Sequence, residues 1–394
     1  MLVSMSHASH ALKHPPVTAP SEPAGVPSSF AELGVAIDRE RRRGRGAPTN
    51  LRPTRTGSAA RVLDGDWLDA AEDIDGEAPR LRTTVTVEHP KTIISRNKSP
   101  DISFDRSINP YRGCEHGCIY CFARPTHAFH DLSPGLDFES KLFAKPDAAK
   151  LLRAELAKRN YKVAPLAIGT NTDGYQPIER EWGITRSVVE VLAETRHPLI
   201  ITTKSDRVLR DIDLLADMAR DNLVGVAVSV TSLDPKIART LEPRAPHPKR
   251  RLAAIRKLID AGVPTQVNIS PIIPAITDHE IEAIMAAAAE AGAIRASYIL
   301  MRLPFEVAPL FRAWLAAHYP DRADKVMHMV QDIRGGRDND AQFFTRMRGQ
   351  GVWAQLTRTR VKRAAREHGM DRSFPQIRSD LFRPPERDGQ MELF

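Results

Sequence analysis

The feature that most constrains the fold is a repeated alternation of short apolar runs with amphipathic segments. Apolar runs of strand length lie at 163–169, 199–203, 223–230, 265–269 and 296–300. The segments around them, such as ITRSVVEVLAET and PKRRLAAIRKLIDAG, have the apolar spacing of amphipathic helices. This order predicts parallel strands joined by right-handed crossovers. We therefore expect an α/β fold, a partial (β/α)6 TIM-like barrel.

Composition divides the chain into three segments. Residues 1–80 are rich in Pro, then Arg, then acidic residues, with few apolar positions to offset the entropy of ordering, so we expect a disordered charged tail. Residues 81–305 carry the barrel pattern. Residues 306–394 are expected to form a basic helical extension and a C-terminal tail, since 16 basic and 11 acidic groups lie from 311 onward.

The apolar runs are too short for a membrane protein. No stretch approaches the roughly 18 apolar residues of a membrane span. The first residues also lack the apolar run of a secretory signal. We expect a cytoplasmic protein with no membrane contact.

The three cysteines of the chain are crowded into NPYRGCEHGCIYCFAR, at Cys114, Cys118 and Cys121. This is no disulfide framework, and the flanking Gly113 and Gly117 allow a loop to wind tightly around a metal. Two sites fit the spacing. A structural zinc would need a fourth ligand from His116, His127 or His130. A [4Fe-4S] cluster has four corners, so three thiolates would leave one iron open to bind another molecule.

The motif Cys-x3-Cys-x2-Cys, with Tyr120 before its last cysteine and strand–helix units after it, resembles the radical SAM superfamily. The segments TDGYQPIE, ITTKS, LEPRAP and PIIPAITD are similar to the branch called DNA repair photolyase, which includes spore photoproduct lyase. The resemblance covers about residues 90–305. It implies an enzyme that uses a [4Fe-4S] cluster to cleave S-adenosylmethionine (SAM) reductively. The product is a 5′-deoxyadenosyl radical that abstracts hydrogen from a substrate.

The resemblance also implies site residues. Cys114, Cys118 and Cys121 would hold the cluster, and Tyr120 would pack near the adenine of SAM. Thr172 and Asp173 replace the usual Gly-Gly-Glu loop that receives the SAM amino group. The remaining cofactor contacts implied are Lys204 to the SAM carboxylate, Ser229 near the cofactor and Asn268 near the adenosine. Glu242 and Arg244, in LEPRAP, could pair with each other or point at the substrate, and pairing is the expected role.

One absence separates this chain from spore photoproduct lyase. That enzyme returns a hydrogen atom from an additional cysteine after the second strand, and this chain has no cysteine outside the cluster motif. The hydrogen donor is therefore open, with Tyr175 or another tyrosine as a candidate. Substrate and product are open too.

Two C-terminal features predict partners. The basic segment from Arg346 to Arg366, with Trp353 inside it, suits a phosphate backbone and a stacked base. The last residues, Gln390 to Phe394, resemble the peptide by which bacterial repair proteins bind the sliding clamp. An external electron donor is implied as well. We expect nucleic acid to be the substrate, in repair or modification. Two other hypotheses remain: a radical SAM enzyme for a small molecule or a protein, and a zinc-stabilised nucleic-acid-binding protein without enzymatic activity.

Overall fold

The main sheet is an open barrel of parallel strands. The computed structural model describes residues 42–51, 53 and 81–385, and within them seven strands lie in the order β10-β9-β8-β7-β6-β3-β2. Six pair in parallel, and β2 adds antiparallel at one edge. Their bounds are β2 Ile94–Arg96, β3 Arg106–Ile108, β6 Leu166–Ile168, β7 Leu199–Thr203, β8 Val224–Ser229, β9 Thr265–Ile272 and β10 Arg295–Leu300. The predicted partial (β/α)6 barrel is confirmed.

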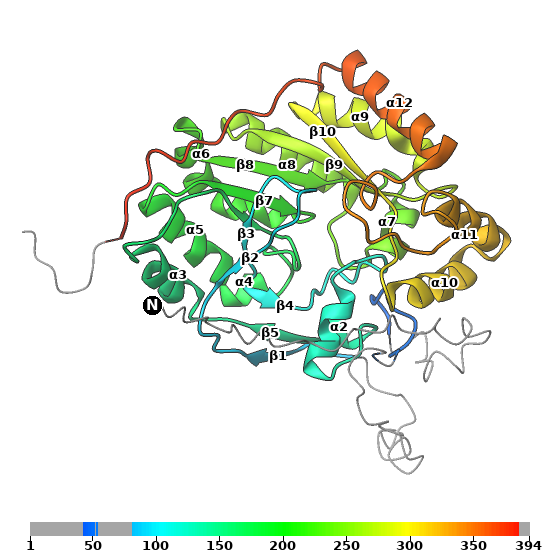
Figure 1. The fold of residues 1–394 in the computed structure, drawn as a ribbon, viewed down its shortest axis with the longest axis horizontal. Helices are drawn as coiled ribbons and strands as arrows, with labels where there is room; N and C mark the ends of the chain where they lie inside the picture. Colours follow the sequence, from blue (N-terminus) through cyan, green and yellow to red (C-terminus); the bar gives the residue numbers. More distant parts are fainter. Residues whose placement is uncertain (1–41, 52, 54–80, 386–394) are drawn as a thin grey trace, which may run out of the picture.

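Helices cover the outer face of this sheet (Figure 1). The long ones are α3 Ala148–Leu156, α5 Ile184–Glu194, α6 Ile212–Arg220, α8 Pro248–Asp260 and α9 Ile281–Glu290. The short ones are α4 Glu179–Trp182, η2 Asp206–Asp211, α7 Pro235–Leu241 and η3 Asp278–Glu280. In α5, Val188 and Leu192 lie one turn apart and are both fully buried, which is the helical spacing that the sequence showed. Their burial in the main core holds the helix against the strands.

A second, smaller sheet leads into the cysteine loop. Its order is β1-β5-β4, and it lies below the barrel in Figure 1. Strand β5 pairs in parallel with β1 and antiparallel with β4. The bounds are β1 Thr84–Val87, β4 Tyr111–Arg112, β5 Lys141–Ala144, η1 Arg124–His130 and α2 Asp137–Ser140. Because β4 ends just before Gly113, this sheet fixes where the cysteine loop begins.

A short stretch of the expected N-terminal tail is folded. Within residues 42–51, the Arg45 guanidinium donates to the Glu139 carbonyl at 2.6 Å and to the Leu81 carbonyl at 3.1 Å. The backbone N–H groups of Gly46 and Ala47 each donate to the Glu139 carboxylate at 2.8 Å. The expectation of disorder is wrong for this stretch, because a buried carboxylate satisfies its backbone. Residues 1–41, 52 and 54–80 lie outside the described residues.

The C-terminal helices form a second core with the cysteine loop. Ile119 and Tyr120 share this core with Phe311 and Trp314 of α10. The elements after the barrel are α10 Val307–His318, η4 Pro320–Arg322, α11 Ala323–Asp332 and α12 Gly351–Glu367. The extension predicted as helical is therefore also part of the packing around the loop.

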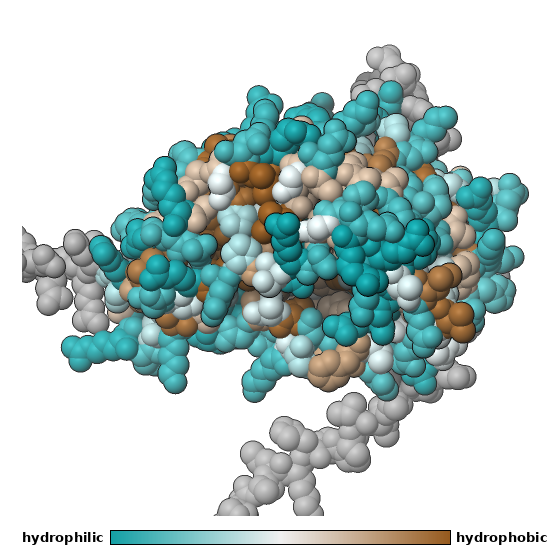
Figure 2. Space-filling model, turned by 90° about the horizontal axis from the view of Figure 1, so that it is seen from above, coloured by the Kyte–Doolittle hydropathy of each residue, from teal (hydrophilic) through white to brown (hydrophobic). Residues whose placement is uncertain are grey.

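After α12 the chain runs back along the sheet (Figure 1). The Arg378 and Arg383 backbone N–H groups donate to the carbonyls of Asn222 and Thr195, at 2.9 and 2.8 Å. These carbonyls lie just before β8 and β7, so the segment crosses the amino end of the barrel. The face seen in Figure 2 is mostly hydrophilic, with small separate apolar areas. No helix in the described part of the chain is long and apolar enough to cross a membrane.

Candidate active site at the cysteine loop

The cysteine loop follows β4, and two glycines shape it. Gly113 and Gly117 have φ angles of +71° and +67°, a left-handed conformation that other residues rarely adopt. A Cβ at Gly113 would lie 2.7 Å from the Phe138 carbonyl oxygen, and one at Gly117 would lie 2.7 Å from Glu139 Oε2. The loop therefore depends on glycine for both its conformation and its close packing.

A buried ion pair supports the loop from behind. Arg124 Nη2 and Glu139 Oε1 are 2.5 Å apart, and both side chains are fully buried. Arg124 also donates to the carbonyls of Cys118 (2.9 Å) and Gly117 (3.1 Å). The guanidinium thus fixes the backbone between the first two cysteines.

The three thiols have the chemistry that a cluster needs. Burial raises the pKa of the Cys114 thiol well above its usual value, and Asp173, Cys118 and Cys121 raise it further. Burial and Glu242 raise the pKa of Cys118 to about 12, although Lys204 opposes this shift. Each of these thiols is therefore harder to ionise while its neighbours carry negative charge. A positively charged metal centre bound at this loop would stabilise the thiolates and release their protons.

The histidines do not complete a zinc site. His116 Nδ1 lies 3.4 Å from the Asp173 carboxylate. His127 Nε2 bonds to the Lys141 carbonyl at 2.8 Å, and His130 packs against Phe143. Among the residues that the structure describes, no three His, Cys, Asp or Glu side chains form a group suited to a single metal ion. A cubane bonds each thiolate to a different iron, so its three ligands need not converge on one point. The donor set fits a cluster better than a zinc ion.

Tyr120 lies inside a buried polar network. Its hydroxyl donates to the Glu242 carboxylate and lies 3.3 Å from Thr231 Oγ1. Arg251 pairs with Glu242 at 2.5 Å, and Lys204 Nζ lies 5.7 Å from the centre of the Tyr120 ring. The structure therefore brings Tyr120 and Lys204 together beside the cysteine loop, and their roles as SAM contacts stay predictions.

Asp173 and Thr172 are engaged by the protein. Asp173 accepts from Thr203 Oγ1 and the Lys204 backbone N–H, both at 2.7 Å, besides its contact with His116. Burial would raise the pKa of Asp173, but His116 and these donors lower it to about 2. Thr172 is buried and donates to the Tyr111 carbonyl at 3.3 Å. Both residues lie next to the loop, and their assignment as SAM contacts stays a prediction.

Ser229, the last residue of β8, is the register partner of Asn268, which lies in the middle of β9. Ser229 is buried, and its carbonyl accepts from Arg251 at 3.3 Å. Asn268 is half-buried and accepts from Ser297 Oγ and from Gln266 Nε2. Ser229 lies at the carboxyl end of its strand, where such folds carry their sites, whereas β9 continues past Asn268 to Ile272. The cofactor roles of both residues stay predictions.

One expectation about a side-chain pair is wrong, and one candidate role is disfavoured. Glu242 does not pair with Arg244, because Arg251 lies closer, and Arg244 instead pairs with Glu115 at 3.2 Å. Tyr175 is fully buried beside Asp211. Since its phenol faces neither solvent nor an open site, it is a poor candidate for the hydrogen donor.

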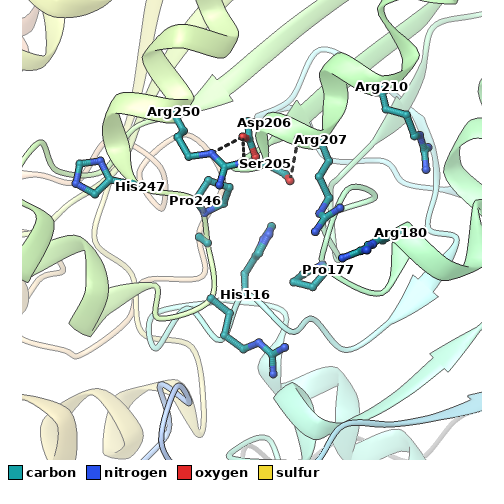
Figure 3. A pocket seen from close by; sticks show the side chains of 12 residues that line it. His116, Pro177, Arg180, Ser205, Asp206, Arg207, Arg210, Pro246, His247 and Arg250 are labelled. Atoms are coloured by element: carbon teal, nitrogen blue, oxygen red, sulfur yellow. Dashed lines mark hydrogen bonds and ion pairs between the residues drawn. The ribbon is translucent and has the colours of Figure 1, made fainter.

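A basic cavity adjoins the loop and was missed from the sequence. It has a volume of about 590 Å³ and is lined by His116, Pro177, Arg180, Ser205, Asp206, Arg207, Arg210, Arg244, Ala245, Pro246, His247 and Arg250. Three of its five arginines are paired with acids, namely Arg210, Arg244 and Arg250. Arg180 and Arg207 are exposed, and we find no side-chain partner for either within the described residues. Figure 3 shows their guanidinium groups pointing toward one another beside Pro177.

The basic segment from Arg346 to Arg366 is partly neutralised. Arg346 pairs with Asp101 at 2.5 Å, Arg360 with Glu282 at 2.6 Å and Arg363 with Glu367 at 2.8 Å. Trp353 is half-buried and packs one side against the main core, and its stacking on a base stays a prediction. The proposed clamp peptide, Gln390 to Phe394, lies outside the described residues.

The fold and the loop define a class: enzymes that carry an iron–sulfur cluster on three cysteines at the mouth of a parallel barrel. Residues 108–288 match the family model of the radical SAM superfamily. The chain is 36% identical over 240 residues to the uncharacterized protein Rv2578c of Mycobacterium tuberculosis, which covers 60% of this chain and 71% of that one. It is 29% identical to the uncharacterized protein MJ0683 of Methanocaldococcus jannaschii, over 44% of this chain and 62% of that one.

Solved structures agree on the fold. Spore photoproduct lyase complexed with dinucleoside spore photoproduct superposes with a TM-score of 0.52 at 16% identity, over 72% of this chain and 79% of that one. The chain belongs to the radical SAM superfamily. It is an enzyme whose cofactors are a [4Fe-4S] cluster and SAM.

We predict that Arg124→Met strongly destabilises the fold. The change leaves the buried Glu139 carboxylate without its cation, which typically costs about 3–5 kcal/mol of the free energy of unfolding. Arg153→Met is the matched control, because Arg153 pairs with Glu194 on the surface, where such pairs contribute less than about 1 kcal/mol. Chemical denaturation followed by circular dichroism measures both. Equal losses in the two variants would contradict this account of the loop.

Acid should remove the stabilisation that Glu242 provides. Burial alone would raise its pKa, but Arg251 and Lys204 lower the pKa from 4.5 to about 2. A carboxyl group whose pKa is lower in the folded state stabilises the fold at any pH above its pKa in the unfolded state. This stabilisation is lost as the pH falls through the pKa of the folded state. At 1.36 kcal/mol per unit the effect is about 3 kcal/mol. The difference in unfolding free energy between the parent and Glu242→Gln should therefore shrink as the pH falls from 5 toward 2. A constant difference would contradict it.

Proposed function

We propose that this enzyme cleaves SAM reductively and uses the resulting radical to abstract hydrogen from a nucleic acid. The superfamily supports the first half. The basic cavity beside the cysteine loop supports the second half, and it is the observation on which the choice of substrate rests. The reaction would belong to nucleic-acid repair or modification.

The chain's own residues divide the work of holding the cofactors. When bound, the two cofactors supply an electron and a sulfonium, whose cleavage gives methionine and a 5′-deoxyadenosyl radical. Cys114, Cys118 and Cys121 are the proposed ligands of the cluster. Burial lowers the pKa of Lys204, but Cys118 and Glu242 raise it more, so the net shift is upward. The ammonium group of Lys204 therefore stays charged and suits the carboxylate of SAM. Tyr120 provides an aromatic wall on the same side.

The cavity suits a phosphate backbone. It lies in the loops after β6, β7 and β8, at the carboxyl ends of the strands, where parallel barrels carry their sites. Two exposed guanidinium groups directed at each other repel, and an anion between them removes this cost. Arginine binds phosphate through two parallel N–H donors. Arg180 and Arg207 are thus the groups that we propose contact the substrate's phosphates.

The reaction of spore photoproduct lyase is not carried over. The chain lacks a cysteine outside the cluster motif, and the Tyr175 phenol is buried. The path by which a hydrogen atom returns to a product radical must therefore differ from that in the lyase. This restricts the proposal to hydrogen abstraction from nucleic acid, with repair of spore-type damage left out.

The other partners expected from the sequence are part of the proposal. The exposed part of the Arg346 to Arg366 segment, which includes Arg348, Lys362 and Arg366, is proposed to extend the contact with nucleic acid. A sliding clamp is proposed to bind Gln390 to Phe394, and an external donor to supply the electron. The cytoplasmic location also stays a prediction.

The first half of the proposal predicts the behaviour of the reconstituted enzyme. After anaerobic addition of iron and sulfide, dithionite and SAM should yield 5′-deoxyadenosine, and oligonucleotides should increase the yield. Cys118→Ala removes one cluster ligand, so both bound iron and 5′-deoxyadenosine should fall to background. Iron content and chromatography of the products measure this. A colourless zinc protein that leaves SAM intact would refute the assignment of the cysteines.

The second half predicts a change in salt dependence. Arg180→Gln and Arg207→Gln should each weaken binding of a duplex oligonucleotide and reduce the slope of log affinity against log salt, by about 0.9 for each phosphate that the variant no longer neutralises. Arg220→Gln is the control, because Arg220 is exposed on α6 and pairs with Asp217. Fluorescence anisotropy over a salt series measures the slopes. Unchanged slopes in both cavity variants would remove the support for a nucleic-acid substrate.

A further inference from the structure

Exposed phenylalanines gather around two arginines beside the last cysteine of the loop. Phe122 directly follows Cys121, and the Arg302 guanidinium lies 5.5 Å from the centre of its ring. The Arg346 guanidinium lies 4.7 Å from the ring of Phe343. Arg302 connects the two parts, because its Nη1 contacts Met347 Sδ at 3.3 Å. We name Phe122, Arg302, Phe343, Phe344 and Arg346 the aromatic–arginine cluster.

The cluster sits at the carboxyl end of the last barrel strand. The Leu300 backbone N–H, at the end of β10, donates to the Met347 carbonyl at 3.1 Å. Asp101 accepts from the Phe344 backbone N–H at 2.6 Å and pairs with Arg346. These contacts fix the 343–347 loop beside the mouth of the barrel. Its rings are therefore held close to the cysteine loop.

The rings of this cluster are exposed to solvent. Phe122 and Phe343 are each 49% exposed, and Phe344 is 68% exposed. Phe344 also has a φ of +68°, a conformation that is costly for a bulky residue and that is often found at functional sites. Core packing does not explain the position of Phe344, because its exposed ring contributes little to a hydrophobic core.

Arg302 lacks good acceptors. It is half-buried, and its Nε is buried without a hydrogen-bond partner within the described residues. The thioether of Met347 is only a weak acceptor. Burial lowers the pKa of Arg302, and the nearby Arg346 lowers it further. A guanidinium left in this way favours a ligand that brings oxygen or nitrogen acceptors to it.

A nucleobase supplies both things that this cluster lacks. Its flat face stacks on phenylalanine rings and on guanidinium planes, and its edge carries acceptors. In a duplex both faces of the base are covered by neighbours, so the base must be single-stranded or extruded. We propose that an unpaired nucleobase of the substrate stacks on the aromatic–arginine cluster and accepts a hydrogen bond from Arg302. This inference rests on the proposed nucleic-acid substrate and adds selection for an unpaired nucleotide.

The test compares three labelled oligonucleotides on the reconstituted full-length enzyme. They are a single strand, the same strand in a duplex, and a single strand with abasic sites that keeps its phosphates but lacks the central bases. Phe343→Ala and Phe344→Ala should each weaken binding of the intact single strand by roughly 5- to 100-fold, the usual effect of losing one stacked base. Binding of the abasic strand should stay unchanged. Phe344→Trp should keep the affinity of the parent, because it retains an aromatic face.

Phe129→Ala is the matched control. Phe129 is exposed on η1, where the neighbouring His127 and His130 pack toward Phe143 of β5. The Phe129→Ala variant should leave the affinities for all three oligonucleotides unchanged. Equal weakening of the intact and abasic strands by the cluster variants would overturn stacking while leaving nucleic-acid binding in place. Failure of the parent to bind any oligonucleotide would instead overturn the proposed function and this inference with it. A change of oligomeric state in the variants, with oligonucleotide binding unaltered, would assign the surface to contact between copies and also overturn the proposal.

Discussion

The cysteine loop depends on a fully buried ion pair between Arg124 and Glu139. All five N–H groups of the Arg124 guanidinium have acceptors: four backbone carbonyls and the Glu139 carboxylate. The carboxylate in turn accepts the backbone N–H groups of Gly46 and Ala47. Burial of two charges is costly unless their hydrogen-bonding capacity is met in this way. One pair thus joins the loop to η1, to α2 and to a distant N-terminal stretch.

A second buried pair holds the loop from the barrel side. Glu242 lies between Arg251 and the Tyr120 hydroxyl, so the residue before Cys121 is tied to α8 through two side chains. The two buried pairs act on different parts of the loop. Arg124–Glu139 holds the backbone at Cys118, and Arg251–Glu242 holds Tyr120, the residue before Cys121. The Arg124–Glu139 pair makes its hydrogen bonds within the protein, whereas Arg251 and Glu242 contact each other as an ion pair outside hydrogen-bond geometry. The positions of the cysteine backbones are therefore set by the fold, and the cofactors meet a loop that is already organised.

The sequence predicted those features that local pattern encodes. The run at 199–203 became β7 with the same bounds, and the apolar spacing in 184–195 became α5, because strand and helix periods are local properties. Strand β3 was missed, since it has three residues and two of them are polar, Arg106 and Ser107. The cysteine loop, which we propose holds the cluster, was recognised from cysteine spacing, which is also local.

Local patterns could not predict the buried groups that support the cysteine loop, nor the basic cavity. Glu139 lies 15 positions from Arg124 and over 90 from Gly46, and no periodicity links these residues. The cavity collects arginines from three separate strand–helix connections that lie far apart in the sequence. The contiguous basic run that did stand out, from Arg346 to Arg366, proved partly neutralised by neighbouring acids. Linear charge density was thus a poor guide, because partners distant in sequence decide which charges remain free.

The distribution of free charge supports the proposed nucleic-acid substrate over a small metabolite. Acidic groups close to the loop are already committed: Asp173 to His116, Glu242 to Arg251, and Glu115 to Arg244. Arg180 and Arg207, which have no acidic partner in the part of the chain that the structure describes, face an open cavity, whereas Arg302 lies with exposed rings beside Cys121. The cavity with Arg180 and Arg207 offers positive charge without an aromatic face, whereas the cluster around Arg302 offers both charge and aromatic rings. Nucleic acid presents phosphates and bases separately along one chain, and proteins commonly use phosphate contacts for position and base contacts for selection. A substrate held at both places would leave the nucleotide nearest Cys121 as the one exposed to radical chemistry.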